Sequence, residues 1–384
     1  MSGFYKKGFT QSLFRLLLVW VVCTVAGGLP ITGEAAGYTF HIFTTSKAVD
    51  QVSDENLKKL LKDRPHDLRA GAALPDGGYV NGFYYSEISH WPDFHVAYFQ
   101  YVQELCQGQL DSELCEPLIA HMMGMIAHGF EDESYDTLMD RRSRKYKDTA
   151  IQSNTFLTGR DTLIDKYLLH DHMYLVDLIP IGVSPLDDLY KVFQGMGNTD
   201  VTYQHLAVGE QNILAGAVLK RVITNYWSDL QDSELYPWLR NNYETAPGGV
   251  EFTSAALAKL WNFYWDRLHQ INRPAEPTIF PSDGGEIAVD EDDPWSEFHF
   301  LSDRPIDNES FIGEYDAIDL TTGGLVSLLI RRRNGYLISF VPDMPLTPGH
   351  QYKIIISPGI RDYWGQAVLQ SELSWTVTAK AKLQ

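Results

Sequence analysis

Residues 118–140 read LIAHMMGMIAHGFEDESYDTLMD, and their periodicity decides the fold class of this part of the chain. Apolar residues recur three and four positions apart, as they do on the buried face of an α-helix. Four polar residues follow one another at intervals of seven, four and four: His121, His128, Asp132 and Asp136. A helix places them in one stripe, which is costly to bury without a partner. The stripe indicates either a metal-binding helix or a solvated face, and both interpretations stay open at this point.

The same helical periodicity extends over most of the chain from about residue 46 to 270. It predicts helices over residues 46–61, 94–105, 118–139, 164–177, 211–230 and 255–271. Residues 36–273 are therefore expected to form a mostly α-helical domain.

The pattern changes after Asn272-Arg273-Pro274-Ala275-Glu276-Pro277. Short alternating segments divided by turn residues follow, and they predict strands over 325–330, 336–341, 351–357 and 373–378. Asn334-Gly335 is a strong hairpin signal. Several strands at this spacing predict an all-β sandwich over residues 276–384, so the chain is expected to be multidomain.

The N-terminus has the order of a secretory signal peptide: basic, apolar, then small residues. Lys6, Lys7 and Arg15 precede an apolar run at 16–26. A membrane anchor is the alternative, but the run is shorter than the roughly 20 residues that span a bilayer. Residues 1–35 are expected to be removed. The protein is then secreted or periplasmic, with attachment to the cell surface left open.

Two cysteines remain once the signal, which contains Cys23, is removed. Cys106 and Cys115 are an even number at short spacing, which in an oxidising compartment indicates a disulfide. A pair of free thiols is the alternative.

The chain is strongly acidic, with a formal net charge of -19. Such a surface repels the phosphates of nucleic acid, so no stable nucleic-acid partner is expected. It is compatible with a metal site, which needs carboxylates.

Further ligand candidates lie outside the stripe, and each is weak alone. Asp76 and His90 flank a Gly- and Tyr-rich loop, His41 follows the proposed mature N-terminus, and Asp161 and Asp165 lie four apart on a predicted helix. Their order resembles that of the zinc-dependent phospholipase C family, which includes the catalytic domain of glycosylphosphatidylinositol-specific phospholipase D. The related zinc-dependent single-strand nucleases use a similar trinuclear site.

The resemblance rests on four motifs: a His near the mature N-terminus, an Asp, a His followed by Trp, and a helix with His-x3-Asp. They match His41-Ile42-Phe43, Gly71-Ala72-Ala73-Leu74-Pro75-Asp76, His90-Trp91 and His128-Gly129-Phe130-Glu131-Asp132. The resemblance covers about residues 36–180, is expected to reach residue 270, and implies a zinc-dependent phosphodiesterase, a hydrolase.

The resemblance also implies roles for these residues. Asp132 would bridge two metal ions, and Asp76 would both bind a metal and orient the attacking water. Asp76, His90 and His128 would complete one site, and His41 the other. Where the family has histidines for a third ion, this chain has Asp136, Asp161 and Asp165. Three carboxylates suit Mg²⁺ or Ca²⁺ better than Zn²⁺, so two or three ions are expected.

The C-terminal segment resembles a bacterial immunoglobulin-like family. The matching stretches are PTIFPSDGG at 277–285, FVPDMPLTPGHQY at 340–352 and IRDYWG at 360–365. The resemblance implies an immunoglobulin-like sandwich, and no catalytic residue is expected there.

The substrate is a separate question. Five aromatic residues lie between or beside Asp76 and His90: Tyr79, Phe83, Tyr84, Tyr85 and Trp91. Such rings cage a quaternary ammonium headgroup or stack on bases. The acidic charge favours a phospholipid, or another phosphodiester, met during transient contact with a membrane surface. A single-strand nuclease and a non-catalytic metal-binding surface protein are the alternatives. The headgroup, C-type against D-type cleavage and the oligomeric state are not predicted.

Overall fold

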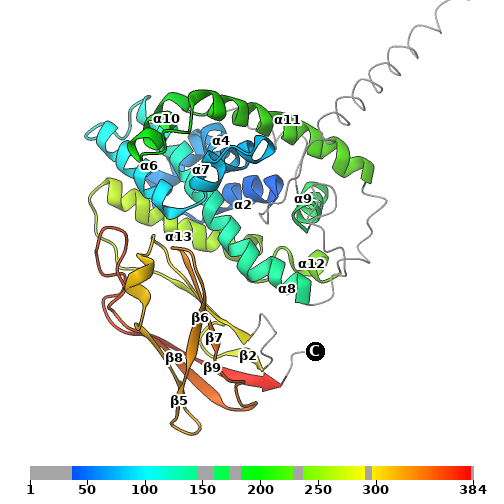
Figure 1. Ribbon diagram of the computed structural model, residues 1–384, viewed down its shortest axis with the longest axis vertical. Helices are drawn as coiled ribbons and strands as arrows, with labels where there is room; N and C mark the ends of the chain where they lie inside the picture. Colours follow the sequence, from blue (N-terminus) through cyan, green and yellow to red (C-terminus); the bar gives the residue numbers. More distant parts are fainter. Residues whose placement is uncertain (1–36, 146–159, 173–182, 228–236, 290–295, 382–384) are drawn as a thin grey trace, which may run out of the picture.

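The computed structural model describes residues 37–145, 160–172, 183–227, 237–289 and 296–381. A helical region comes first and a β-sheet region follows (Figure 1), which is consistent with two domains. The expectation of a helical region followed by a β region is confirmed. The expected signal segment, 1–35, lies outside the described residues.

The helical region is built around one central helix, α7, whose residues are almost all buried. The helices are α2 (Tyr38–Gln51), α3 (Glu55–Asp63), α4 (Pro65–Ala73), the 3-10 helix η1 (Leu74–Asn81), α5 (Tyr85–Ser89), α6 (Pro92–Leu105), α7 (Cys115–Ser134), the π-helix η2 (Tyr135–Asp140), α8 (Arg141–Lys145), α9 (Arg160–Asp171), α10 (Leu186–Gly195), α11 (Tyr203–Trp227), α12 (Pro237–Asn242) and α13 (Val250–Leu268). None of the helices in the described ranges combines the length and the apolar character needed to cross a bilayer.

One helix prediction and one loop prediction need correction. The prediction of a single helix over 46–61 is wrong, because α2 ends at Gln51 and α3 begins at Glu55. The Asp54 carboxylate caps α3 by accepting hydrogen bonds from the backbone N–H groups of Asn56 and Leu57, which the apolar periodicity does not register. The prediction of a Gly- and Tyr-rich loop before His90 is also wrong, since this segment contains η1 and α5.

Glycines bring α4 and α7 into backbone contact. A Cβ on Gly71 would lie 2.1 Å from the carbonyl oxygen of His121, and a Cβ on Gly124 would lie 2.1 Å from that of Leu68. Real Cβ atoms do not approach backbone atoms this closely, so only glycine fits at either position. The contact places the end of α4, which leads into η1, directly against α7.

A disulfide joins Cys106, the residue after α6, to Cys115, the first residue of α7. This is the pairing expected from the sequence. It closes the polar turn between these two neighbouring helices.

The described strands of the β region form two sheets. The first has the order β1 (Thr278–Phe280), β3 (Phe298–Leu301), β7 (Leu337–Pro342), β6 (Leu328–Arg333). The second has the order β2 (Gly285–Val289), β9 (Leu373–Ala381), β8 (Gln351–Ile356), β4 (Tyr315–Asp319), β5 (Leu325–Val326). Both sheets contribute to one hydrophobic cluster. The strand predicted over 325–330 is wrong as one element, because β5 and β6 belong to different sheets and the chain crosses between them at Ser327.

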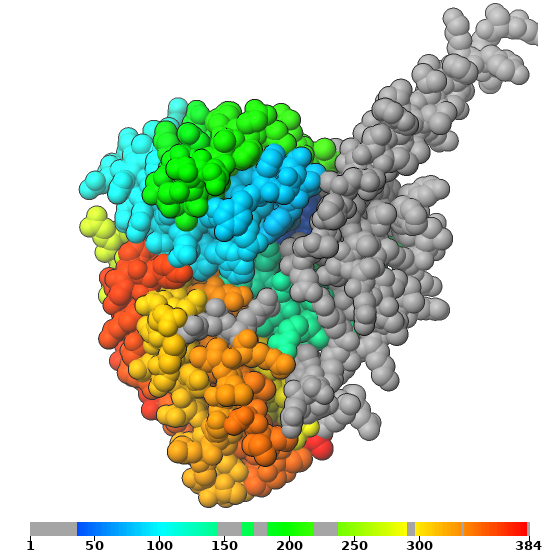
Figure 2. All heavy atoms as spheres, in the orientation of Figure 1, coloured from blue at the N-terminus to red at the C-terminus, as the bar shows by residue number. Residues whose placement is uncertain are grey.

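The β region packs directly against the helical region. Figure 2 shows it, coloured yellow to red, directly beneath the helices. Tyr336 and Leu337 belong to the main hydrophobic cluster of the helical region. The ring of Trp364 lies 5.6 Å from that of Phe99, and the guanidinium of Arg267 lies 3.8 Å above the Trp364 ring.

Gly124→Ala should destabilise the protein by about 1–3 kcal/mol, because its methyl group would push α4 away from α7. Gly216→Ala in α11, where a Cβ meets nothing within 4 Å, is the control and should be neutral or slightly stabilising. Chemical denaturation of both variants measures the difference. Equal free energies of unfolding for the two variants would show that the helices tolerate separation.

Candidate metal centre

Five expected ligands from separate parts of the sequence meet in one place. His41 lies on α2, Asp76 on η1, His90 directly after α5, and His128 with Asp132 on α7. They form two groups, and within each group all ligand atoms lie within 4.8 Å of one another. One group is His41, His128 and Asp132, and the other is Asp76, His90 and His128. The groups share His128, so the described residues offer two adjacent positions for a metal ion.

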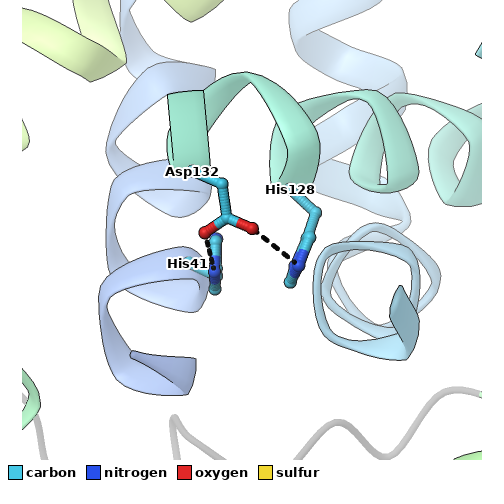
Figure 3. A group of neighbouring side chains, drawn as sticks. All are labelled: His41, His128 and Asp132. Atoms are coloured by element: carbon cyan, nitrogen blue, oxygen red, sulfur yellow. Dashed lines mark ion pairs between the residues drawn. The ribbon is translucent and has the colours of Figure 1, made fainter. Parts of the chain in front are cut away.

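The Asp132 carboxylate lies between the two groups. Its Oδ1 is 3.2 Å from Nε2 of His41. Its Oδ2 is 3.2 Å from Nε2 of His90 and 3.4 Å from Nε2 of His128. Figure 3 shows one oxygen turned to His41 and the other to His128. One carboxylate thus reaches both groups, which a bridging ligand must do.

The second group closes around Asp76. Its Oδ1 lies 3.5 Å from Nε2 of His128 and 3.8 Å from Nε2 of His90, and the two imidazole Nε2 atoms are 2.9 Å apart. Asp76 is the more exposed member, at 25% of its side chain, whereas His90 and His128 are buried. The centre therefore opens to solvent on the Asp76 side.

Backbone carbonyls orient two of the imidazoles. Nδ1 of His128 lies 2.8 Å from the carbonyl oxygen of Ala72, and Nδ1 of His90 is bonded to the carbonyl oxygen of Ser86. A carbonyl only accepts, so each Nδ1 carries a proton, and in the neutral ring Nε2 is the nitrogen whose lone pair faces the centre. This is the tautomer that a metal ligand needs.

Glu131 orients the third imidazole. Its Oε2 lies 2.8 Å from Nδ1 of His41, and its Oε1 accepts a hydrogen bond of 2.9 Å from the Thr45 hydroxyl. All three side chains are fully buried. The buried Nε2 of His41 has no partner with hydrogen-bond geometry among the described residues, and it lies 3.2 Å from Oδ1 of Asp132, which places it as a ligand atom on that side of the centre.

The charges of the centre shift the pKa values in opposite directions. Burial alone lowers the pKa of His41 and His90, but the carboxylates beside them outweigh it, and the pKa of His90 rises to about 10. Burial alone raises the pKa of Asp76 and Asp132, but the nearby imidazoles, His128 first, hold both pKa values below the ordinary range. Both carboxylates are therefore ionised at neutral pH. Three imidazoles with two carboxylates are a donor set that suits zinc.

The expected ligands of a third ion whose side chains are described are not members of these two groups. Asp136 is on the π-helix η2 and Asp165 is buried on α9, and neither belongs to the two groups found in the described residues. Asp165 accepts a hydrogen bond of 2.9 Å from the backbone N–H of Phe40, beside His41. The side chain of Asp161 lies outside the part that the structure describes. His121 is buried in the core, with Nδ1 3.2 Å from the Tyr98 hydroxyl.

A carboxylate between aromatic rings lies beside the centre. Glu87 accepts hydrogen bonds from the Tyr79 hydroxyl at 3.3 Å and from the Trp91 indole at 2.9 Å. The Tyr79 ring lies 5.3 Å from that of His90. Of the other aromatic residues near the ligands, Phe83 stacks on His205 and Tyr85 is buried.

Sequence reasoning missed Glu131 and Glu87. Glu131 stands next to Asp132, and no ligand spacing distinguishes it. A signal did exist in α2, where Thr45 follows His41 by four residues and so shares its face. Glu87 precedes His90 by three residues, but its role depends on two rings that the fold brings to it.

No protein-family model and no curated protein matches the sequence. Solved structures of a bacterial surface-layer protein, SbsC, are similar to the chain at a low level. Its N-terminal part matches with a TM-score of 0.24 and 11% identity, over 83% of this chain and 79% of that one. Two longer fragments match with TM-scores of 0.23 and 0.22, also at 11% identity, over 76% and 90% of this chain and 46% of each fragment. TM-scores this low do not support a shared fold.

Glu131→Gln keeps the size of the side chain and replaces one of its two acceptor oxygens with an amide nitrogen, so it cannot accept from both His41 and Thr45. We expect zinc to bind at the His41 group about tenfold more weakly, since losing a partner of a ligand costs 10–100-fold in affinity. Competition with a chelator measures this. Glu116→Gln, on the same helix, loses an ion pair of 2.7 Å to Arg64 and should bind zinc as wild type does. Unchanged affinity in Glu131→Gln would contradict the role.

Proposed function

We propose that this protein is a secreted, zinc-dependent phosphodiester hydrolase of the phospholipase C type. The observation that carries the proposal is the Asp132 carboxylate, which directs one oxygen to His41 and the other to His90 and His128. Polynuclear metal sites with a bridging carboxylate suit phosphodiester hydrolysis. Bound there, two ions would lower the pKa of a water molecule and stabilise the charge that develops on the phosphate.

The residues of the chain take separate roles in this proposal. His41, His90 and His128 hold ions through Nε2, and Asp132 joins the two positions. Asp76 is the most exposed of the five side chains, so it would both bind a metal ion and orient the attacking water. Asp136, Asp161 and Asp165 remain the proposed ligands of a third ion, Mg²⁺ or Ca²⁺ rather than zinc.

The surroundings of the centre support a phospholipid substrate. Glu87 lies between Tyr79 and Trp91, and a carboxylate flanked by rings suits a cationic headgroup. A net charge of -19 opposes the approach of a polyanion. A single-strand nuclease is the second candidate, because the same rings could stack on bases. A protein that binds metal without catalysis is the third.

We also propose that the β region is an immunoglobulin-like module. The four-stranded order β1-β3-β7-β6 and the run β9-β8-β4 in the other sheet support it. They correspond to the ABED and GFC orders of that fold.

Zinc-loaded full-length protein should contain about two or three equivalents of metal and cleave a choline or inositol phospholipid faster than single-stranded DNA. Metal analysis and a parallel turnover assay on the three substrates test this. Faster cleavage of DNA would favour the nuclease. Two bound metals with no turnover of any phosphodiester would favour the non-catalytic protein.

Asp132→Asn keeps the shape of the side chain and removes the charge that two ions share. We expect it to lose one metal and to lower turnover by roughly a hundredfold or more, because the bridging water loses half of its activation. Asp136→Asn, on the same helical segment, should be milder. If Asp136→Asn lost the same metal and as much turnover, the bridge would lie at Asp136 instead.

A further inference from the structure

A buried chain of polar groups runs from the β region to the residue beside His90. His95, on α6, lies with Nε2 3.1 Å from the carbonyl oxygen of Ser89 and with Nδ1 3.0 Å from the hydroxyl of Tyr336. The Tyr336 hydroxyl is also 3.0 Å from that of Tyr264 on α13. His95, Tyr264 and Tyr336 are fully buried. None of the three belongs to the metal centre described above.

The donors and acceptors available fix the direction of these hydrogen bonds. The carbonyl of Ser89 only accepts, so Nε2 of His95 donates to it. Burial lowers the pKa of His95 to about 3, so the ring is neutral and its Nδ1 accepts from the Tyr336 hydroxyl. The Tyr336 oxygen in turn accepts from Tyr264. Removing the Tyr336 hydroxyl therefore leaves a buried acceptor on His95 without its donor, which is costly.

The turn that carries Tyr336 is fixed on both sides. Gly335 has φ +86°, and a Cβ there would lie 2.5 Å from Cγ of Pro92, two residues after His90. Within the β region the Gly335 carbonyl accepts from the N–H of Ile306 at 2.7 Å. The N–H of Gly335 donates to the Asn308 side chain at 3.1 Å. The turn is thus anchored in the β region and presses on the segment after His90.

Helix α7 packs against the same segment. A Cβ on Gly129 would lie 2.2 Å from the carbonyl oxygen of His90 and 2.7 Å from Cε1 of His95. The backbone of His90 and the ring that Tyr336 supports therefore both lie against Gly129, the residue after His128. A shift of His95 would move this backbone relative to His128.

We propose that Tyr336, in the hairpin between β6 and β7, is a positioning residue for the metal centre, acting through His95 and Ser89 on His90. It touches no ligand atom, and its effect is on the geometry of the group Asp76, His90 and His128. The proposal rests on metal binding at this centre, not on the reaction that the centre catalyses.

Full-length Tyr336→Phe tests the proposal. Phenylalanine keeps the ring stacked on His95, at 5.8 Å between ring centroids, and removes only the hydroxyl. Chelator competition should show one of the two metals bound about tenfold more weakly, in the range for partners of ligands. Absorption of the cobalt-substituted protein should change for that metal alone. Tyr352→Phe is the control, since its buried hydroxyl accepts from the N–H of Thr347 at 2.8 Å within the β region.

The control separates positioning from general loss of stability. Tyr352→Phe should keep the affinity and the cobalt spectrum of the wild type. Affinity of Tyr336→Phe within twofold of wild type would overturn the proposal, and so would an equal loss in both variants. Wild-type protein that binds metal but cleaves no phosphodiester would defeat the proposed function and leave this inference standing.

Discussion

The backbone contact between α4 and α7 is the constraint on which the candidate metal centre depends. Gly71 and Gly124 allow the two helices to approach so closely that a Cβ at either position would lie 2.1 Å from a backbone carbonyl oxygen of the other helix. At this distance the Ala72 carbonyl at the end of α4 reaches Nδ1 of His128 on α7. The chain then enters η1, which carries Asp76 to the other side of the same imidazole. One close approach therefore sets both the tautomer of His128 and the position of its neighbour.

Burying this many ionisable groups is unfavourable unless they satisfy one another. The arrangement does so by alternating charge: Glu131 faces His41, His41 faces Asp132, and Asp132 faces His90 and His128. Without a cation His41 and His90 take up protons, as their raised pKa values indicate, whereas burial lowers the pKa of His128. A metal ion bound here would compete with protons for the lone pairs of His41 and His90.

The sequence was sufficient for features that depend on local spacing. The pair His128 and Asp132 share a helix face because four residues make about one turn, and the hairpin at Asn334-Gly335 follows from turn chemistry. The helical and β regions were recognisable from their periods. Three other kinds of feature could not be predicted from the sequence. Carbonyl oxygens such as that of Ser86 have no sequence signature, caps such as Asp54 interrupt a continuous apolar pattern, and Tyr336 meets His95 across 241 residues of chain.

The boundary between the two regions shows that a change from helical to strand periodicity in the sequence does not divide the protein into two independently stable parts. The pattern after Asn272 marks where helices give way to strands, and it does so correctly. The interface itself, however, contains Tyr336, Leu337 and Trp364, which read in the sequence as ordinary strand and turn residues. Their partners, Phe99 and Tyr264, read as ordinary core residues of helices. Because both sides are apolar and aromatic, their burial against each other stabilises the pair of regions together. A hairpin fixed by such an interface holds its polar tip in place, which is the physical basis for the proposed effect of the turn residue Tyr336 on the candidate ligand His90.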